Sequence, residues 1–145
     1  MIGIQTDKSD NQERNPALFD HSNVVNMSVV LNSVKYPLLD ANANFTKHQY
    51  TQFYKHMTDF ARDYYGMDSM VGASAIQPLA YKELTPLYVF NVSKQSERLN
   101  QGVVDITVDM QFSANVGANT KAYALVISGS RLKLQSDGKK MNVLY

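Results

Sequence analysis

Cysteine and tryptophan are both absent from this chain of 145 residues. The lack of cysteine excludes disulfide bonds, thiolate nucleophiles and thiolate metal ligands together. An excess of one charge is also missing, because 14 basic side chains face 13 acidic ones and leave a formal net charge of +1. This balance gives no electrostatic reason for binding to nucleic-acid phosphates or to an anionic membrane surface.

Long hydrophobic runs are missing as well, and no stretch approaches the roughly 20 apolar residues of a membrane span. Hydrophobic residues nevertheless make up 44% of the chain and charged residues 19%, which argues against global disorder. The length is that of one domain with a real core. The first stretch is polar and mixed in charge, so we expect residues 1–15 to form a mobile arm or linker and residues 16–145 a single domain.

About six β-strands are predicted by alternating or β-branched stretches. Even-numbered apolar residues alternate with polar ones from Val104 to Phe112, which predicts an interior strand with one buried face. Two stretches are apolar on both faces and need cover on both sides, Leu87 to Val92 and Ala122 to Ser128. The others are Met27 to Tyr36 and a hairpin whose turn is Ser136 to Lys139. Strands and helices do not alternate, so an antiparallel β-sandwich is favoured over a parallel sheet.

One amphipathic helix is predicted at residues 47–65, between the strands. Thr46 and Gln49 have the spacing of a capping box at its start, and Gly66 follows its last periodic residue. Its apolar face is a candidate packing or interface surface, because the three-four spacing is that of one helical face. The residues of this face are Tyr50, Phe53, Tyr54, Met57, Phe60 and Tyr64.

Catalytic and metal-binding patterns are weak. His48 and His56 lie eight residues apart, whereas paired ligands on one helix usually lie three or four apart. A Ser-x-x-Lys pattern at residues 130–133 and a Ser-Asp-Asn pattern at residues 9–11 echo penicillin-recognising enzymes, but their order is reversed and the Lys-Thr-Gly element is missing. We therefore expect no catalytic residues, no cofactor and no metal, and a protein that is not an enzyme.

Several stretches together resemble the C-terminal region of hexon-like, double jelly-roll major capsid proteins of Polinton (Maverick) elements and adintoviruses. The match runs from about Asn15 to the last residue, and its best anchors are Val89 to Ser93 and the Tyr-Ala-Leu-Val strand that starts at Tyr123. The stretches that carry it are NPALFDH (15–21), LNSVKYP (31–37), LYVFNVSKQSERL (87–99) and ANTKAYALVISGSRLKLQSDGKKMNVLY (118–145).

This resemblance implies a structural role. Each family subunit carries two jelly rolls in tandem, and three subunits form a capsomer of an icosahedral shell. The present length matches one jelly roll, so the chain is expected to be the C-terminal half. The implied partners are other copies in a homotrimer, neighbouring capsomers, and minor capsid or penton proteins. The implied location is the virion, after synthesis in the host cytoplasm and, as one option, assembly in the nucleus.

Two other readings of the residues remain open. A stand-alone β-sandwich binding module would recognise a glycan or a protein partner, and a hydrolase would use a site that no motif reveals. A strand-rich half encoded in frame upstream favours the capsid subunit over the module.

Overall fold

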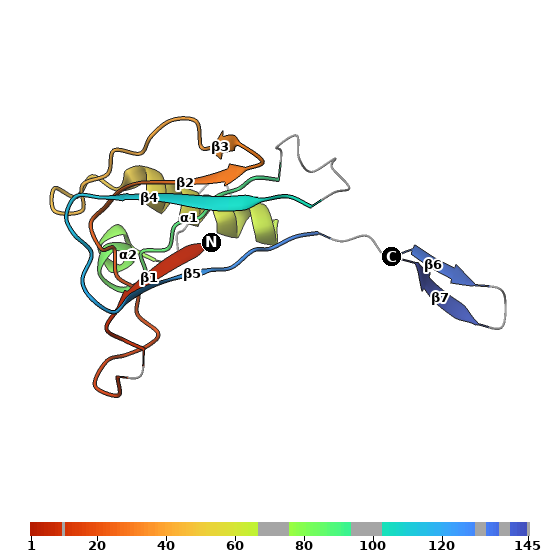
Figure 1. Cartoon of the computed structure of the whole chain (residues 1–145), viewed down its shortest axis with the longest axis horizontal. Coiled ribbons are helices and arrows are strands. Elements are labelled where there is room, and N and C mark those ends of the chain that lie inside the picture. The colour runs from red at the N-terminus through yellow and green to blue at the C-terminus, as the bar shows by residue number, and fades with distance from the viewer. Residues whose placement is uncertain (10, 67–75, 94–102, 130–132, 137–139, 145) are drawn as a thin grey trace.

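The computed structural model describes residues 1–9, 11–66, 76–93, 103–129, 133–136 and 140–144 (Figure 1). The fold is mainly β with antiparallel sheets, so the predicted class is confirmed. Within these ranges two helices are present where one was predicted. The elements in chain order are β1 (Ile2–Thr6), β2 (Val24–Leu31), β3 (Val34–Tyr36), α1 (Thr51–Tyr65), α2 (Pro78–Leu84), β4 (Ile106–Phe112), β5 (Thr120–Ala124), β6 (Lys133–Ser136) and β7 (Met141–Leu144).

The strands form three antiparallel groups. The largest is a three-stranded sheet in the order β3-β2-β4, in which Leu31 faces Ile106 and Val29 faces Val108. The second is the pair β1-β5, in which Ile2 faces Ala124. The third is the β6-β7 hairpin, which confirms the predicted C-terminal hairpin. Strands distant in the sequence therefore pair within the first two groups, as in a sandwich.

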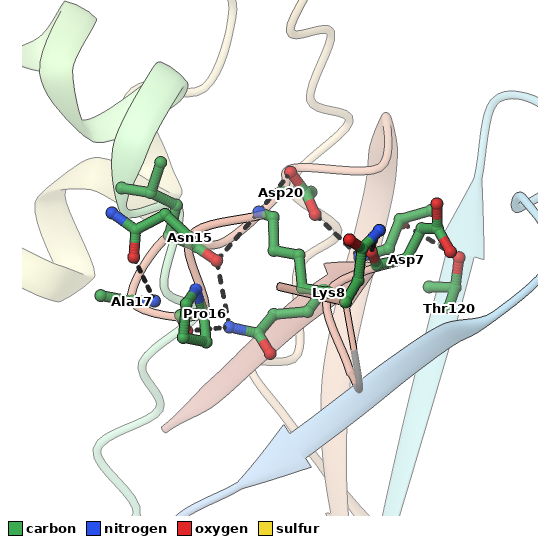
Figure 2. A network of polar contacts seen from close by, with 11 residues as sticks. Asp7, Lys8, Asn15, Pro16, Ala17, Asp20 and Thr120 are labelled. Atoms are coloured by element: carbon green, nitrogen blue, oxygen red, sulfur yellow. Dashed lines mark hydrogen bonds and ion pairs between the residues drawn. The ribbon is translucent and has the colours of Figure 1, made fainter. Parts of the chain in front are cut away.

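The expectation of a mobile arm over residues 1–15 is wrong for residues 2–6, because they form the strand β1. The outer face of β1 is covered by the following segment, where the Gln5 side-chain amide donates to the carbonyls of Pro16 and Leu18 at 2.6 and 3.0 Å. Lys8 donates to an Asp20 carboxylate oxygen at 2.8 Å, and the other oxygen accepts from the Thr6 backbone N–H. Figure 2 shows this network, which ties the polar segment to the sheet.

Helix α1 begins at Thr51, four residues after the predicted start. The capping box is wrong, because Asn44 and Gln49 instead exchange two backbone hydrogen bonds of 2.8 Å around a turn in which His48 has a positive φ of 57°. The end of the helix is confirmed, since Gly66 has a left-handed φ of 63° and its N–H donates to the Arg62 carbonyl. Glycine accepts this conformation without a steric cost.

The predicted strand from Met27 to Tyr36 is a hairpin instead, formed by β2 and β3. Asn32 and Ser33 both have positive φ at its turn, which is the backbone that a two-residue hairpin requires. The predicted strand from Leu87 to Val92 is also wrong as a strand. Tyr88 alone forms a bridge, to Ile2, although the segment is buried at Tyr88 and Val89. Burial explains its apolar sequence without regular pairing.

The prediction for Val104 to Phe112 is confirmed in part. Val108, Met110 and Phe112 pack against the core, as their even-numbered positions predicted. Ile106 is 50% exposed, however, and β4 pairs with β2 alone among the described strands, which makes it an edge strand. Because no described strand lies on the other side of β4, Ile106 at its start has fewer neighbours to cover it.

The core is formed by residues from the β1-β5 and β3-β2-β4 sheets and from both helices. Its members include several aromatic side chains, and the largest fully buried ones are Tyr81, Tyr88, Phe45 and Phe53. Aliphatic side chains of β1 and β2 complete the cluster, such as Ile4 and Val24. None of the helices within the described ranges has the length and apolar character needed to cross a lipid bilayer.

Candidate functional site

The apolar face of α1 starts inside the core of the chain. Tyr50 and Phe53 are buried, and Tyr54 and Met57 are partly buried against the same cluster. Phe53 meets Tyr88 edge to face, with ring centroids 4.9 Å apart. This part of the face packs against the chain itself.

The same face becomes exposed towards the end of α1. Phe60 is partly buried and stacks on Tyr64 with ring centroids 5.1 Å apart. Tyr64 is 56% exposed, and Tyr65 beside it is 69% exposed. The C-terminal end of the helix therefore carries exposed aromatic side chains.

Four tyrosine hydroxyls on or near this face hold loops in place, each by donating to a backbone carbonyl. The pairs are Tyr50 to Pro78 at 3.0 Å, Tyr54 to Ile76 at 2.9 Å, Tyr81 to Leu87 at 3.1 Å and Tyr88 to His21 at 2.9 Å. Burial raises the pKa of both Tyr81 and Tyr88 above the usual value. These phenols stay protonated at neutral pH and serve as donors, which is a structural role.

The histidines do not come together. His21 stacks on Phe45 with centroids 4.5 Å apart, and burial lowers its pKa. Burial also lowers the pKa of His56, which lies on α1, while His48 is exposed on the preceding turn. His56 lines a depression of about 300 Å³ with Asp59, whose carboxylate pairs with Lys55 and Arg62. These ion pairs offset the negative charge of Asp59, which is the acidic residue nearest to His56 in the sequence.

The remaining candidates give no catalytic arrangement. No group of three or more His, Asp or Glu side chains within the described ranges could hold a metal ion. Residues 130–132 of the Ser-x-x-Lys pattern and the middle residue of the Ser-Asp-Asn pattern at 9–11 lie outside the described residues. Asp105 and Asp109, two of the polar residues that alternate with apolar ones from Val104 to Phe112, are exposed, as on a solvated strand face.

A depression that the sequence did not predict lies where three loops meet. Its volume is about 530 Å³, and its lining combines apolar side chains with the amide-bearing residues Asn23, Asn42, Asn44 and Gln49 and with Ser113. The segments that carry it are tied together, because Ala43 N–H donates to the Val25 carbonyl at 2.8 Å and Ser113 N–H to the Asn23 carbonyl at 3.0 Å. Its residues come from distant parts of the sequence, so no local pattern signals it.

An apolar surface continues from β5 away from the core. The chain after this strand exposes three consecutive large side chains, with Leu125 58%, Val126 65% and Ile127 48% exposed. The sequence predicted a strand here that needs cover on both sides, but β5 ends at Ala124 and the described residues leave the apolar stretch uncovered. An exposed run of this kind marks an interaction surface.

Comparison with known families gives one match. The family model for the double jelly roll-like domain matches residues 1–131. Comparisons with curated proteins and with solved structures gave no match. The double jelly roll is a structural fold typical of viral capsid proteins, and its β-sandwich agrees with the antiparallel strands described above. Because the match covers far more than half of the chain, this protein belongs to the double jelly roll-like domain family.

Proposed function

We propose that this chain is a structural subunit of a viral capsid, of the hexon-like type found in Polinton elements and adintoviruses. It assembles into trimeric capsomers of an icosahedral shell, as part of a subunit whose other half is a second jelly roll. The observation that carries the proposal is the family match over residues 1–131.

The surface of the chain supports assembly over turnover. Apolar side chains lie exposed at the end of α1 and after β5, at Tyr64, Tyr65 and Leu125 to Ile127. Interfaces between subunits are enriched in aromatic and apolar residues of this kind. The expected partners are therefore other copies, with minor capsid or penton proteins as further neighbours in the virion.

Light scattering after size-exclusion chromatography tests this proposal at micromolar concentration. We expect trimers or larger assemblies, and negative-stain images should show ring-shaped or shell-like particles. Raising the salt concentration should leave them intact, because apolar burial is not screened by ions. A single sharp monomer peak with a high melting temperature would contradict the proposal.

A second candidate function is a stand-alone β-sandwich module that binds a glycan, and the amide-lined depression favours it. Asn23, Asn42 and Gln49 are exposed there, and amides offer donors and acceptors to sugar hydroxyls. Asn42 has a φ of 47°, so Asn42→Gly removes the amide and keeps the backbone relaxed. Micromolar binding on a glycan array that is lost in this variant, with the monomer intact, would favour the module over the capsid subunit.

A further inference from the structure

The strand β5 lies beside a part of the core that is not closed. Ala122 and Ala124 face Ile4 and Ile2 in register, so all four side chains point to the same side of the sheet. Ile2 and Ile4 are buried there, whereas Ala122 and Ala124 are exposed. The apolar interior therefore covers β1 and stops before it reaches β5.

The edge of β5 is open as well. One side of this strand is bonded to β1, and no described strand pairs with its other side. The pairing with the N-terminus continues to Leu125, whose N–H donates to the Met1 carbonyl at 2.8 Å. An unpaired edge next to apolar side chains is a template for another strand. The exposed Val126 and Ile127 extend that template beyond the end of β5.

The β6-β7 hairpin is a strand pair that needs a sheet to pack on, whereas β5 is a sheet edge that can accept a strand. A hairpin of two strands is marginally stable alone and needs a further strand or a sheet to pack on. Figure 1 shows β6 and β7 standing clear of the other elements. Leu134 on β6 is 61% exposed. The chain thus carries a strand pair without a sheet and a sheet with an open edge.

We propose that the β6-β7 hairpin of one copy adds to the open edge of β5 in a second copy of this chain and covers its exposed apolar side. This inference rests on the proposed assembly of the chain and names the segments that perform it. The contact joins two different surfaces, the β6-β7 hairpin of one copy and the β5 edge of the next, so it is head-to-tail, and a head-to-tail contact with a suitable rotation closes into a ring. A ring of three such contacts is a trimer.

Two charged substitutions test the two sides of the contact in the full chain. Leu134→Lys alters the hairpin and Val126→Lys alters the receiving edge, and both positions are exposed, so the fold of each copy is retained. Each variant should weaken self-association about tenfold or more, which corresponds to about 1.4 kcal/mol. Gln135→Lys, on the adjacent position and opposite face of β6, is the matched control and should associate like the wild type. Circular dichroism melting confirms folding.

Mixing the two variants gives the sharpest result. A Val126→Lys copy has an intact hairpin, and a Leu134→Lys copy has an intact edge, so a mixture can form one complete contact. We expect a one-to-one dimer in the mixture where each variant alone is monomeric. Wild-type assembly that both variants retain, or a mixture that stays monomeric, would overturn the exchange and leave capsid assembly standing. A monomeric wild type would overturn both.

Discussion

Two neighbouring strands of one sheet, β1 and β5, have opposite surroundings. They share a regular antiparallel ladder from Ile2–Ala124 to Thr6–Thr120. The first four residues of β1 are buried on both faces, while most of β5 is exposed on both faces. The two strands share the hydrogen bonds of this ladder, so the difference comes from what covers the faces and the far edge of each strand.

The cover of β1 comes from the segment that follows it and from a second segment far away in the sequence. A Cβ atom at Gly3 would lie 2.4 Å from the Phe19 ring and 3.1 Å from Leu87. On the far edge, Tyr88 exchanges two backbone hydrogen bonds with Ile2, of 2.8 and 2.9 Å. No described segment gives β5 equivalent cover. We infer that β1 is stabilised within one copy and that β5 gains its stability on assembly.

The largest expected effect contrasts the buried and exposed parts of α1. Phe53→Asp should destabilise the fold by about 4 kcal/mol or more, because it removes a buried aromatic ring and places a carboxylate in the core. That loss is a large part of a typical total stability of roughly 5–15 kcal/mol. Tyr65→Asp makes a similar change at a side chain that is 69% exposed, and should cost less than about 0.5 kcal/mol. Urea unfolding measures both, and equal losses would show that the two ends of the helix do not differ.

A smaller difference in stability is expected between a substitution in β1 and one in the segment after β5. Gly3→Val should cost about 2 kcal/mol, because the added carbons meet Phe19 and force the covering segment outward. Gly129→Val is the control, since a Cβ there meets nothing within 4 Å, and it should leave the melting temperature unchanged in the monomer. If the first variant melted like the wild type, the cover of β1 would be looser than its contacts indicate.

Local sequence patterns correctly predicted the elements that local interactions determine. The three-four spacing of α1 and the glycine at Gly66 were sufficient for the helix and its end. The C-terminal hairpin is confirmed by the pairing of β6 with β7, while residues 137–139 of its predicted turn lie outside the described residues. Alternation predicted the buried face of β4 at Val108 and Met110. Each of these signals lies within a few turns or residues of the element that it specifies.

The features that depend on contacts between distant parts of the sequence were not predicted. The strand β1 is five residues long and precedes a polar segment, and its burial depends on the later Phe19 and Asp20. Helix α2 has seven residues, and Pro78 at its first turn was the available signal. The amide-lined depression joins three loops. Such features depend on contacts between residues far apart in the sequence, and local sequence patterns do not show these contacts.

The smallest effect concerns the far edge of β1, where Tyr88 donates its hydroxyl hydrogen bond to the His21 carbonyl at 2.9 Å. Tyr88→Phe should cost about 1 kcal/mol at pH 7, because the carbonyl loses its partner. Burial raises the pKa of Tyr88 in the folded chain, whereas the unfolded phenol titrates near the usual value of about 10. Above that pH the unfolded state loses a proton that the folded state keeps, so the stability from this group is complete below about pH 10 and is lost as the pH rises further.

The variant lacks this titration, so its stability should fall less steeply above pH 10 than that of the wild type. The difference between the two free energies of unfolding should shrink by at most about 1.4 kcal/mol per pH unit. Urea unfolding at pH 7, 10 and 11 measures the difference, and absorbance at about 295 nm reports phenolate formation. Tyr81→Phe should behave in the same way, since burial also raises the pKa of Tyr81. Parallel curves for wild type and both variants would mean that these phenols are reached by solvent, and that the side of the molecule around β1 is as open as β5.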